Sequence, residues 1–508
     1  MSTLNSIKLL EPQALWQNFA ALSAVPRPSK QEDKAAAFVV AFGRKQNLET
    51  MQDTAGNVLI RKPATPGMEN RKTVLLQGHL DMVHQKNEAT LFDFSRQGIE
   101  AYDDGDWVRA KGTTLGADNG IGVAAILAIL ASDTIAHPPL EALFTVDEEM
   151  GATGALNLGE GLLRADLLLN LDSEDDTLLT IGCAGSLDIT VSGSYRQESI
   201  GATLQGYQLT VGGLTGGHSG LDIHLGRANA VKLLIHLLTQ IKEVIELRIC
   251  SMSGGNLRNA IPREATAAIA VPKEDVQLLN EVVSEQVEML KASYAVTDPQ
   301  LEVTLVPSPP HSSALPLEFQ EKVLLAVHTC PNGIYSLSNT IPGLVQTSNN
   351  LSCVRVQDGS FHAFCLSRSF REEEKVRLAE VIKSAFAVTG VSVTSSGSVP
   401  GWQPDPDTSL VRLVQSLYLE EFGKAPVVSA IHAGLECGII GAKYPNMEMI
   451  SFGPNILGAH SPDERVQVSS VQKFWRLLLQ VLLQVPLQNE TNQRVENYNK
   501  TRSDNKKG

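Results

Sequence analysis

The first part of the chain alternates between short apolar runs and longer apolar segments. Three runs of strand length, within residues 73–83, 140–146 and 165–172, lead into polar residues. The segment 119–132 is apolar over a length that favours a buried helix. Buried strands that alternate with buried helices are typical of a parallel sheet covered on both faces. We therefore expect an α/β domain in this part of the chain.

A helix start is visible ahead of the first of these strands. Ser29 and Glu32 stand three residues apart, just before apolar positions with helical spacing. This is the spacing of a capping box, so we expect Ser29 to cap a helix that begins at this point.

The pattern changes near residue 188. Residues 187–198 and 207–217 alternate with a period of two, which is typical of an antiparallel sheet with one solvent-exposed face. Amphipathic helices are predicted between further strands, and the α/β pattern returns after residue 394. We therefore expect a catalytic α/β domain formed by residues 1–187 and 395–486, interrupted by an inserted α+β domain at 188–394. Residues 487–508 are polar and without periodicity, which predicts a disordered tail.

The insertion is longer than one simple unit requires. At about 200 residues, it exceeds a unit of four strands and two helices, so a doubled unit is one interpretation. The sequence contains no convincing internal repeat to support it.

Composition narrows the class of protein. A length of 508 residues favours two domains, and a net charge of −14 argues against nucleic acid or an anionic membrane as a partner. The six cysteines are scattered, which suits a reducing compartment. The N-terminus lacks the pattern of a signal peptide, and no apolar stretch reaches the roughly 18 residues of a membrane span. These features predict a cytoplasmic protein.

Polar residues with metal-binding side chains follow the predicted strands of the α/β domain. Each has an ordinary interpretation when taken alone: a hydrogen-bonded structural histidine, a helix cap, a turn or a surface residue. As a set they fall at the carboxyl ends of strands, where sites form in open α/β sheets. Two imidazoles and three carboxylates can hold a pair of divalent ions, with one carboxylate bridging them. The set is His79, Asp118, Glu149, Asp172 and His460.

Two neighbouring acids suggest a division of roles. Glu148 and Glu149 follow Asp147 directly, and three adjacent carboxylates repel one another unless cations lie nearby. Adjacent side chains leave the backbone in different directions. One glutamate can therefore bind metal while the other takes the proton of an attacking water. The spacing alone does not say which does which.

Six ordered motifs closely resemble one family. The stretches GHLDMV, GADNGIG, TVDEEMGATGA, NLDSED, GGHSG and GAHSPDE are similar to those of the aminoacyl-histidine dipeptidases, within the carnosinase and aminoacylase family of two-metal hydrolases. The similarity spans residues 5–486. It implies a two-metal hydrolase domain of the α/β class, with a mainly parallel sheet and two zinc ions, and an inserted α+β lid domain.

The resemblance also assigns roles within the motifs. Asp118 would bridge the two ions, His79 and Asp172 would complete one site, and Glu149 and His460 the other. Glu148 would be the general base for a metal-held water, and Asp81 would orient His79. The family further implies a cis peptide bond between Asp118 and Asn119.

In the lid, the resemblance implies that His218 polarises the scissile carbonyl or stabilises the oxyanion. Weaker candidates for binding the substrate are Asn259, Arg368, His432 and Glu436. Arginine suits a carboxylate because its planar fork can donate two hydrogen bonds, although a structural arginine on a strand is an equal alternative for Arg368.

The sequence therefore predicts a two-zinc dipeptidase that cleaves short peptides with a free N-terminus, Xaa-His dipeptides among them. The ligand set also tolerates Mn²⁺ or Co²⁺. Dipeptides are the expected partners, and a homodimer is expected because relatives are often dimers. The alternatives are a deacylase of N-acyl amino acids on the same scaffold and a non-catalytic peptide-binding relative.

Overall fold

The computed structural model describes residues 4–201 and 203–488, and divides the chain into two compact units. Unit 1 comprises residues up to Gly182, Pro404–Ala430 and the chain from Ile439 onwards. Unit 2 comprises Cys183–Gln403 and Ile431–Gly438. The sequence places the boundaries of the insertion at 188 and 394, a few residues inside these limits. None of the helices in the described residues is long and apolar enough to cross a bilayer.

Unit 1 is built around an eight-stranded sheet. The strand order is β1-β2-β6-β3-β7-β23-β8-β22, and a separate four-stranded sheet has the order β24-β25-β5-β4. The strands are β1 (Glu49–Gln52), β2 (Val58–Lys62), β3 (Val74–His79), β4 (Ala101–Asp104), β5 (Trp107–Ala110), β6 (Leu140–Thr145), β7 (Leu167–Asn170), β8 (Leu178–Cys183), β22 (Val427–Ile431), β23 (Glu448–Ser451), β24 (Ile456–Leu457) and β25 (Arg465–Gln467).

The centre of this sheet is parallel, as predicted. Strand β3 lies between β6 and β7, and β7 pairs with β23, all in parallel. The flanking strands β1, β2 and β8 pair antiparallel. The helices of this unit are α1 (Leu4–Ile7), α2 (Gln13–Ser23), α3 (Asp33–Lys45), α4 (Ala117–Ala131), α5 (Thr153–Leu156), α10 (Ser409–Phe422) and α12 (Val468–Gln484). Helix α11 (Glu436–Lys443) begins in unit 2 and continues in unit 1 from Ile439.

Apolar packing explains the helices next to the sheet. Helix α4 is buried along nearly its whole length, and it packs against α2 and β3. Helix α10 contacts β23 and α12. The parallel strands are therefore covered by apolar helices, which is why their side chains form an almost continuous apolar run.

The predicted capping box is wrong. Helix α3 begins at Asp33, and neither Ser29 nor Glu32 caps it with a side chain. The Ser29 hydroxyl donates instead to Asp81 Oδ2 at 2.8 Å, and Glu32 Oε1 accepts the N–H of Lys30 at 2.7 Å. A buried carboxylate outside the helix thus takes the hydroxyl that the local spacing assigns to the cap.

Unit 2 is a doubled unit. Its first half runs β11-α6-β13-β15-α7-β16, and its second half runs β9-α8-β19-β20-α9-β21. In both halves the strands lie in the same antiparallel order from the seam outwards: second, third, first and fourth. The first half is inserted between β9 and α8 of the second. Strands β13 and β19 pair at the seam and join the halves into one sheet.

Short strands accompany the repeated elements of unit 2. In chain order, the strands and helices of this unit are β9 (Gly185–Ser194), β10 (Glu198–Ser199), β11 (Leu204–Gly212), β12 (Gly217–His218), α6 (Ala230–Val244), β13 (Arg248–Gly254), β14 (Ala260–Ile261), β15 (Ala265–Pro272), α7 (Val276–Ser293), β16 (Glu302–Ser308), β17 (Ser313–Ala314), α8 (Leu317–Thr329), β18 (Gly333–Leu337), β19 (Val345–Gln357), β20 (Ser360–Ser369), α9 (Glu372–Ala387) and β21 (Ser392–Val399).

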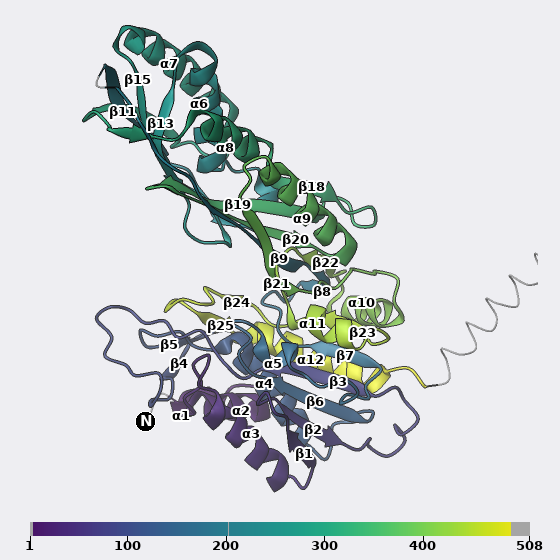
Figure 1. The fold of residues 1–508 in the computed structure, drawn as a ribbon. Helices are drawn as coiled ribbons and strands as arrows, with labels where there is room; N and C mark the ends of the chain where they lie inside the picture. Colours follow the sequence, from purple (N-terminus) through teal and green to yellow (C-terminus); the bar gives the residue numbers. More distant parts are fainter. Residues whose placement is uncertain (1–3, 202, 489–508) are drawn as a thin grey trace, which may run out of the picture. The chain divides into compact units, whose positions relative to one another are not determined.

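The four helices of unit 2 lie along one face of its sheet (Figure 1). A single apolar core extends beneath them and includes Leu237 of α6, Val327 of α8 and Ile382 of α9. The amphipathic pattern of these helices follows from this arrangement, because each buries one face against the sheet.

The predicted tail falls largely outside the described residues, since the description ends at residue 488. The two tail residues that are described still pair with the body of unit 1. Leu487 forms a bridge with Arg71, and the Gln488 N–H donates to Asn70 O at 3.0 Å.

Candidate active site

The metal-binding side chains predicted in unit 1 converge at one edge of its sheet. His79 ends β3, the two glutamates follow β6, and Asp172 follows β7. These three parallel strands are neighbours, so their carboxyl ends meet. Asp118 lies at the start of α4, and His460 lies in the turn between β24 and β25. The Asp118–Asn119 peptide bond is cis, which confirms that prediction.

Two imidazoles each face a pair of carboxylates, and Asp118 is common to both pairs. His79 Nε2 lies 2.9 Å from Asp118 Oδ1 and 3.3 Å from Asp172 Oδ1. His460 Nε2 lies 3.2 Å from Asp118 Oδ2 and 3.0 Å from Glu149 Oε2. The side chains therefore form two groups that could each hold a metal ion and that share Asp118.

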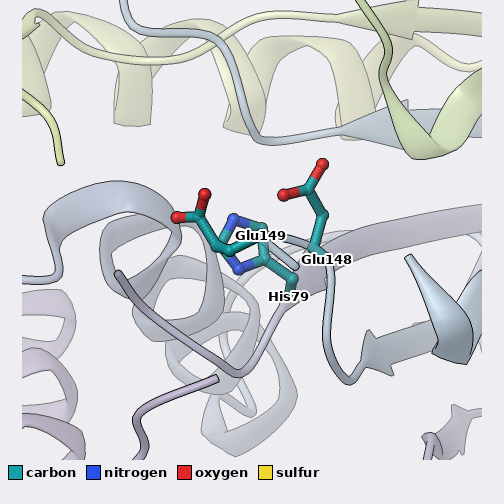
Figure 2. Close-up of side chains that lie close together, drawn as sticks. All are labelled: His79, Glu148 and Glu149. Atoms are coloured by element: carbon teal, nitrogen blue, oxygen red, sulfur yellow. The ribbon is translucent and has the colours of Figure 1, made fainter. Parts of the chain in front are cut away.

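The two adjacent glutamates leave the backbone in different directions. In Figure 2 the carboxylate of Glu149 lies beside the His79 ring, whereas the carboxylate of Glu148 points away from that ring. Atoms of His79, Glu148 and Glu149 still lie within 4.8 Å of one another, so Glu148 borders the same site.

Asp81 organises this end of the sheet. Its Oδ1 lies 3.4 Å from His79 Nδ1, on the side of the ring opposite Asp118. The same carboxylate accepts the N–H groups of Glu148 and Glu149, at 3.0 and 3.2 Å, and the Ser29 hydroxyl. One buried side chain thus fixes the imidazole ring and the backbone of both glutamates.

Asp147, the first of the three adjacent acids, pairs with a lysine side chain. Its carboxylate forms an ion pair with Lys30 and accepts the Thr153 hydroxyl at 2.5 Å. Its positive φ of 57° turns the chain there. The repulsion within the acidic run is therefore relieved partly by Lys30, a residue that the sequence did not single out.

The charges in the site favour a bound cation. Burial lowers the pKa of His79, but Asp172 and Asp118 outweigh this effect and raise the pKa well above its usual value. Hydrogen bonds to Asp118 and Glu149 raise the pKa of His460 to about 11. Burial raises the pKa of Asp172 to about 6. The carboxylates thus hold protons on both imidazoles, and a divalent ion would displace them.

The residues present fit a metal pair. Nitrogen and carboxylate oxygen donors in this number suit zinc and related divalent ions. Glu149 Oε1 is buried and has no hydrogen-bond partner, an arrangement that a cation would satisfy.

A second cluster of candidate residues lies within unit 2. Gly220 lies close to both Arg368 and His432. A Cβ added at this glycine would lie 3.0 Å from Arg368 Nε and 2.2 Å from His432 O, so a larger residue would not fit. His218 Nδ1 accepts the N–H groups of Gly220 and Leu221, at 3.2 and 2.9 Å. Its other nitrogen, Nε2, is therefore left as the donor of the neutral ring.

This second cluster is positively charged but keeps its imidazoles neutral. Burial and the Arg368 charge lower the pKa of His218, and they lower the pKa of His432 to about 3. Burial lowers the pKa of Arg368 to about 10, so its guanidinium stays charged at neutral pH. His432 Nε2 lies 2.8 Å from the Ser348 hydroxyl.

Two further candidates, Asn259 and Glu436, also belong to unit 2. Asn259 is exposed, and its carbonyl accepts the Ser219 N–H at 2.7 Å, next to His218. Glu436 is buried at the start of α11. The structure thus brings Asn259 to the cluster of His218, Arg368 and His432 through its backbone.

Comparison with known proteins identifies the family. Residues 75–484 match the model of peptidase family M20/M25/M40. The chain is 42% identical over 483 residues to the cytosol non-specific dipeptidase of Escherichia coli, which covers 95% of this chain and 100% of that protein. This chain belongs to peptidase family M20/M25/M40. Its members are metallopeptidases, so the chain is assigned to the hydrolases.

The chain is also similar to solved structures of peptidases. The aminoacylhistidine dipeptidase of Vibrio alginolyticus is similar with a TM-score of 0.90 and 41% identity, over 95% of this chain and 98% of that one. An aminopeptidase of Bacillus cereus matches with a TM-score of 0.55 and 14% identity, covering 93% of this chain and 98% of that one. The second likeness shows the fold alone.

Sequence reasoning missed two buried charges of this M20 peptidase. Arg27 and Glu464 are both only 2% exposed, and both contact the backbone beside the candidate ligands. Glu464 ends the motif GAHSPDE, four residues after His460, which is the one signal that could have drawn attention to it. Arg27 lies in no motif. Its partners are carbonyl groups far away in the sequence, so no local pattern marks it.

Proposed function

We propose that this protein is a metal-dependent dipeptidase that hydrolyses dipeptides with a free N-terminus, Xaa-His dipeptides among them. The observation that carries the proposal is the pair of side-chain groups that share Asp118, with Glu148 at their border. The names of two relatives similar over nearly their whole length, a cytosol non-specific dipeptidase and an aminoacylhistidine dipeptidase, support the choice of substrate.

His79, Asp118 and Asp172 would hold one metal ion, and Asp118, Glu149 and His460 the other. Zinc is the proposed metal, and Mn²⁺ or Co²⁺ would also suit these donors. Bound ions would lower the pKa of a water molecule and polarise the peptide carbonyl.

Glu148 would act as the general base. It would take the proton of the attacking water and return it to the leaving amine. Asp81 supports this role, since it holds the Glu148 N–H at 3.0 Å and the neighbouring N–H of Glu149 at 3.2 Å.

The cluster in unit 2 would bind the substrate. The neutral His218 would donate from Nε2 to the carbonyl oxygen as negative charge develops there. Arg368 would bind the C-terminal carboxylate, which suits its buried positive charge. We assign Asn259, His432 and Glu436 supporting roles in the same recognition.

The cytosol is the proposed location, in line with the name of the Escherichia coli relative. The homodimer expected from the resemblance is tested by light scattering of the purified protein.

The decisive experiment measures hydrolysis of a small panel by metal-loaded protein, with and without a chelator. The panel contains β-alanyl-histidine, leucyl-glycine, a tripeptide and an N-acetyl amino acid. We expect chelator-sensitive cleavage of the dipeptides and none of the N-acetyl compound. Cleavage of only the N-acetyl compound would make the protein a deacylase. An inactive protein with metal bound would point to a peptide-binding role.

A further inference from the structure

A buried carboxylate holds the chain segment that leads into Asp118. Glu464 lies outside the two candidate metal groups and is 2% exposed. Its two oxygens accept four consecutive backbone N–H groups: those of Leu115 at 2.7 Å, Gly116 at 2.9 Å, Ala117 at 2.8 Å and Asp118 at 3.3 Å. The start of α4 is thus fixed by one side chain that comes from a distant part of the sequence.

A buried guanidinium also holds this segment, through a carbonyl group. Arg27 Nη2 donates to the carbonyl of Gly116, while Nη1 donates to the carbonyls of Leu80 and Asp81, at 3.0 and 2.9 Å. Gly116 has a φ of 69°, and a Cβ there would lie 2.6 Å from Arg27 Nη2. The close approach of the guanidinium therefore requires glycine at this position.

These contacts connect three of the loops that carry candidate ligands. Arg27 links the chain just after His79 to the chain just before Asp118. Glu464 links that same segment to the turn of His460, because the Glu464 N–H donates to Ser461 O at 3.1 Å within that turn. The N–H and the C=O of Gly116 are both held, so little freedom is left for the aspartate two residues later.

Burying the charges of Glu464 and Arg27 costs free energy, so these residues should have a role other than stability. A buried charge that is hydrogen-bonded to backbone groups is a weak source of stability, since the cost of its desolvation offsets much of the gain. It can instead fix geometry, and metal sites depend on groups that hold their ligands in place. We propose that Glu464 and Arg27 are positioning residues that set the places of Asp118 and His460 before a metal ion binds. This inference rests on the proposed function.

The variant Glu464→Gln tests the proposal. Glutamine has the same shape, but its amide nitrogen would face N–H groups as a donor against donors. We expect the variant to fold, with the far-UV circular dichroism of the wild type. Its affinity for Zn²⁺, measured by titration calorimetry of the metal-free protein, should fall roughly 10- to 100-fold. The visible spectrum of the Co²⁺-loaded protein should change as well, because His460 and Asp118 would shift.

Glu141→Gln is the matched control. Glu141 is also 2% exposed, and it accepts the backbone N–H groups of Arg164 and Ala165, at 2.7 and 3.0 Å, and pairs with Arg61. It lies near the start of β6, whereas the candidate ligands follow the end of that strand. Its loss should lower stability but leave the Zn²⁺ affinity and the Co²⁺ spectrum unchanged.

The possible outcomes distinguish the positioning role from the proposed function. Equal Zn²⁺ affinities and Co²⁺ spectra for wild type, Glu464→Gln and Glu141→Gln would overturn the positioning role while leaving the proposed function intact. Failure of the wild type itself to bind a divalent ion would overturn both. If Glu464→Gln does not fold, Arg27→Lys serves as the test. It keeps the charge but cannot reach three carbonyls, and it should show the same loss of affinity.

Discussion

At the scale of single residues, the two adjacent glutamates have different surroundings. Glu149 faces His460 and keeps one buried oxygen without a hydrogen-bond partner, whereas the carboxylate of Glu148 leaves the backbone in another direction. The backbone N–H groups of both are held by Asp81. The difference therefore lies in what each carboxylate faces.

The variant Glu148→Gln should separate metal binding from catalysis. Glutamine cannot accept the proton of the attacking water, so we expect kcat to fall by about 10²- to 10⁴-fold. Zn²⁺ affinity should stay close to that of the wild type, because Glu148 is absent from both groups that share Asp118. Steady-state kinetics and titration calorimetry check the two halves. Full turnover by this variant would rule out Glu148 as the base.

His432 should make stability depend on pH. Burial and the charge of Arg368 lower its pKa to about 3, below the ordinary value of about 6.5. As the pH falls, His432 therefore binds a proton in the unfolded chain before it does so in the folded protein. The stability contributed by the neutral ring is full above about pH 6.5 and is lost as the pH falls towards 3. Residues that face His432 and influence this pKa include His218 and His224.

Comparison with His432→Gln checks this expectation. The glutamine amide can still form a hydrogen bond with the Ser348 hydroxyl, but the side chain does not titrate. Between pH 6.5 and 4, the loss of unfolding free energy per pH unit should be smaller in the variant, by up to about 1.4 kcal/mol. Urea unfolding at several pH values gives both slopes. Identical slopes would show that His432 is protonated with an ordinary pKa in the folded protein.

At the scale of elements, the seam of unit 2 depends on a close approach of two backbones. Strands β13 and β19 pair over only three residue pairs, from Met252 to Gly254. Gly255 follows with a φ of 70°, and a Cβ there would lie 1.9 Å from Ser352 O. Glycine is needed at this position both for its backbone angle and for space.

Two glycine variants separate these two requirements. Gly390 has a φ of 73°, and a Cβ there would meet no heavy atom within 4 Å. Gly390→Ala should cost about 1–2 kcal/mol through its backbone angle alone. Gly255→Ala should cost a further ~1–3 kcal/mol, because a carbonyl must move. Thermal unfolding of both variants measures the difference. Equal losses would mean that the seam adapts to the extra methyl group.

The doubled unit explains where sequence reasoning stopped. The two halves share their order of elements but no visible sequence repeat, since a buried strand needs only apolar residues at alternate positions. The first half also interrupts the second between β9 and α8, which hides the repeat from a reading along the chain. Length alone raised the possibility of doubling, and strand pairing is what shows it.

The candidate site shows a similar division. Residue types and strand ends were enough to select the side chains that converge in unit 1, because parallel strands end at one edge. Asp81 was assigned to hold His79 through the resemblance, but the other partners that hold these side chains were not predictable. Ser29 looked like a helix cap, and Lys30, Arg27 and Glu464 act on groups far away in the sequence. Local spacing carries no record of such long-range contacts.

At the scale of the whole molecule, each unit has its own compact core, and the two candidate metal groups belong entirely to unit 1. Metal ions without substrate should therefore stabilise unit 1 and leave unit 2 largely unaffected. At a free Zn²⁺ concentration 100-fold above its Kd, one bound ion adds about 2.7 kcal/mol to the free energy of unfolding. The gain should appear in the segments that carry the ligands.

Hydrogen exchange on metal-free and Zn²⁺-loaded protein measures this difference. Protection should rise in the chain around residues 115–118 and 146–149, where backbone N–H groups are held by Glu464 and Asp81. Peptides from β19 and β20 in unit 2 should exchange at the same rate in both samples. Equal protection of the two units would contradict independent stabilisation, because an ion bound only in unit 1 can strengthen unit 2 only if the units open together.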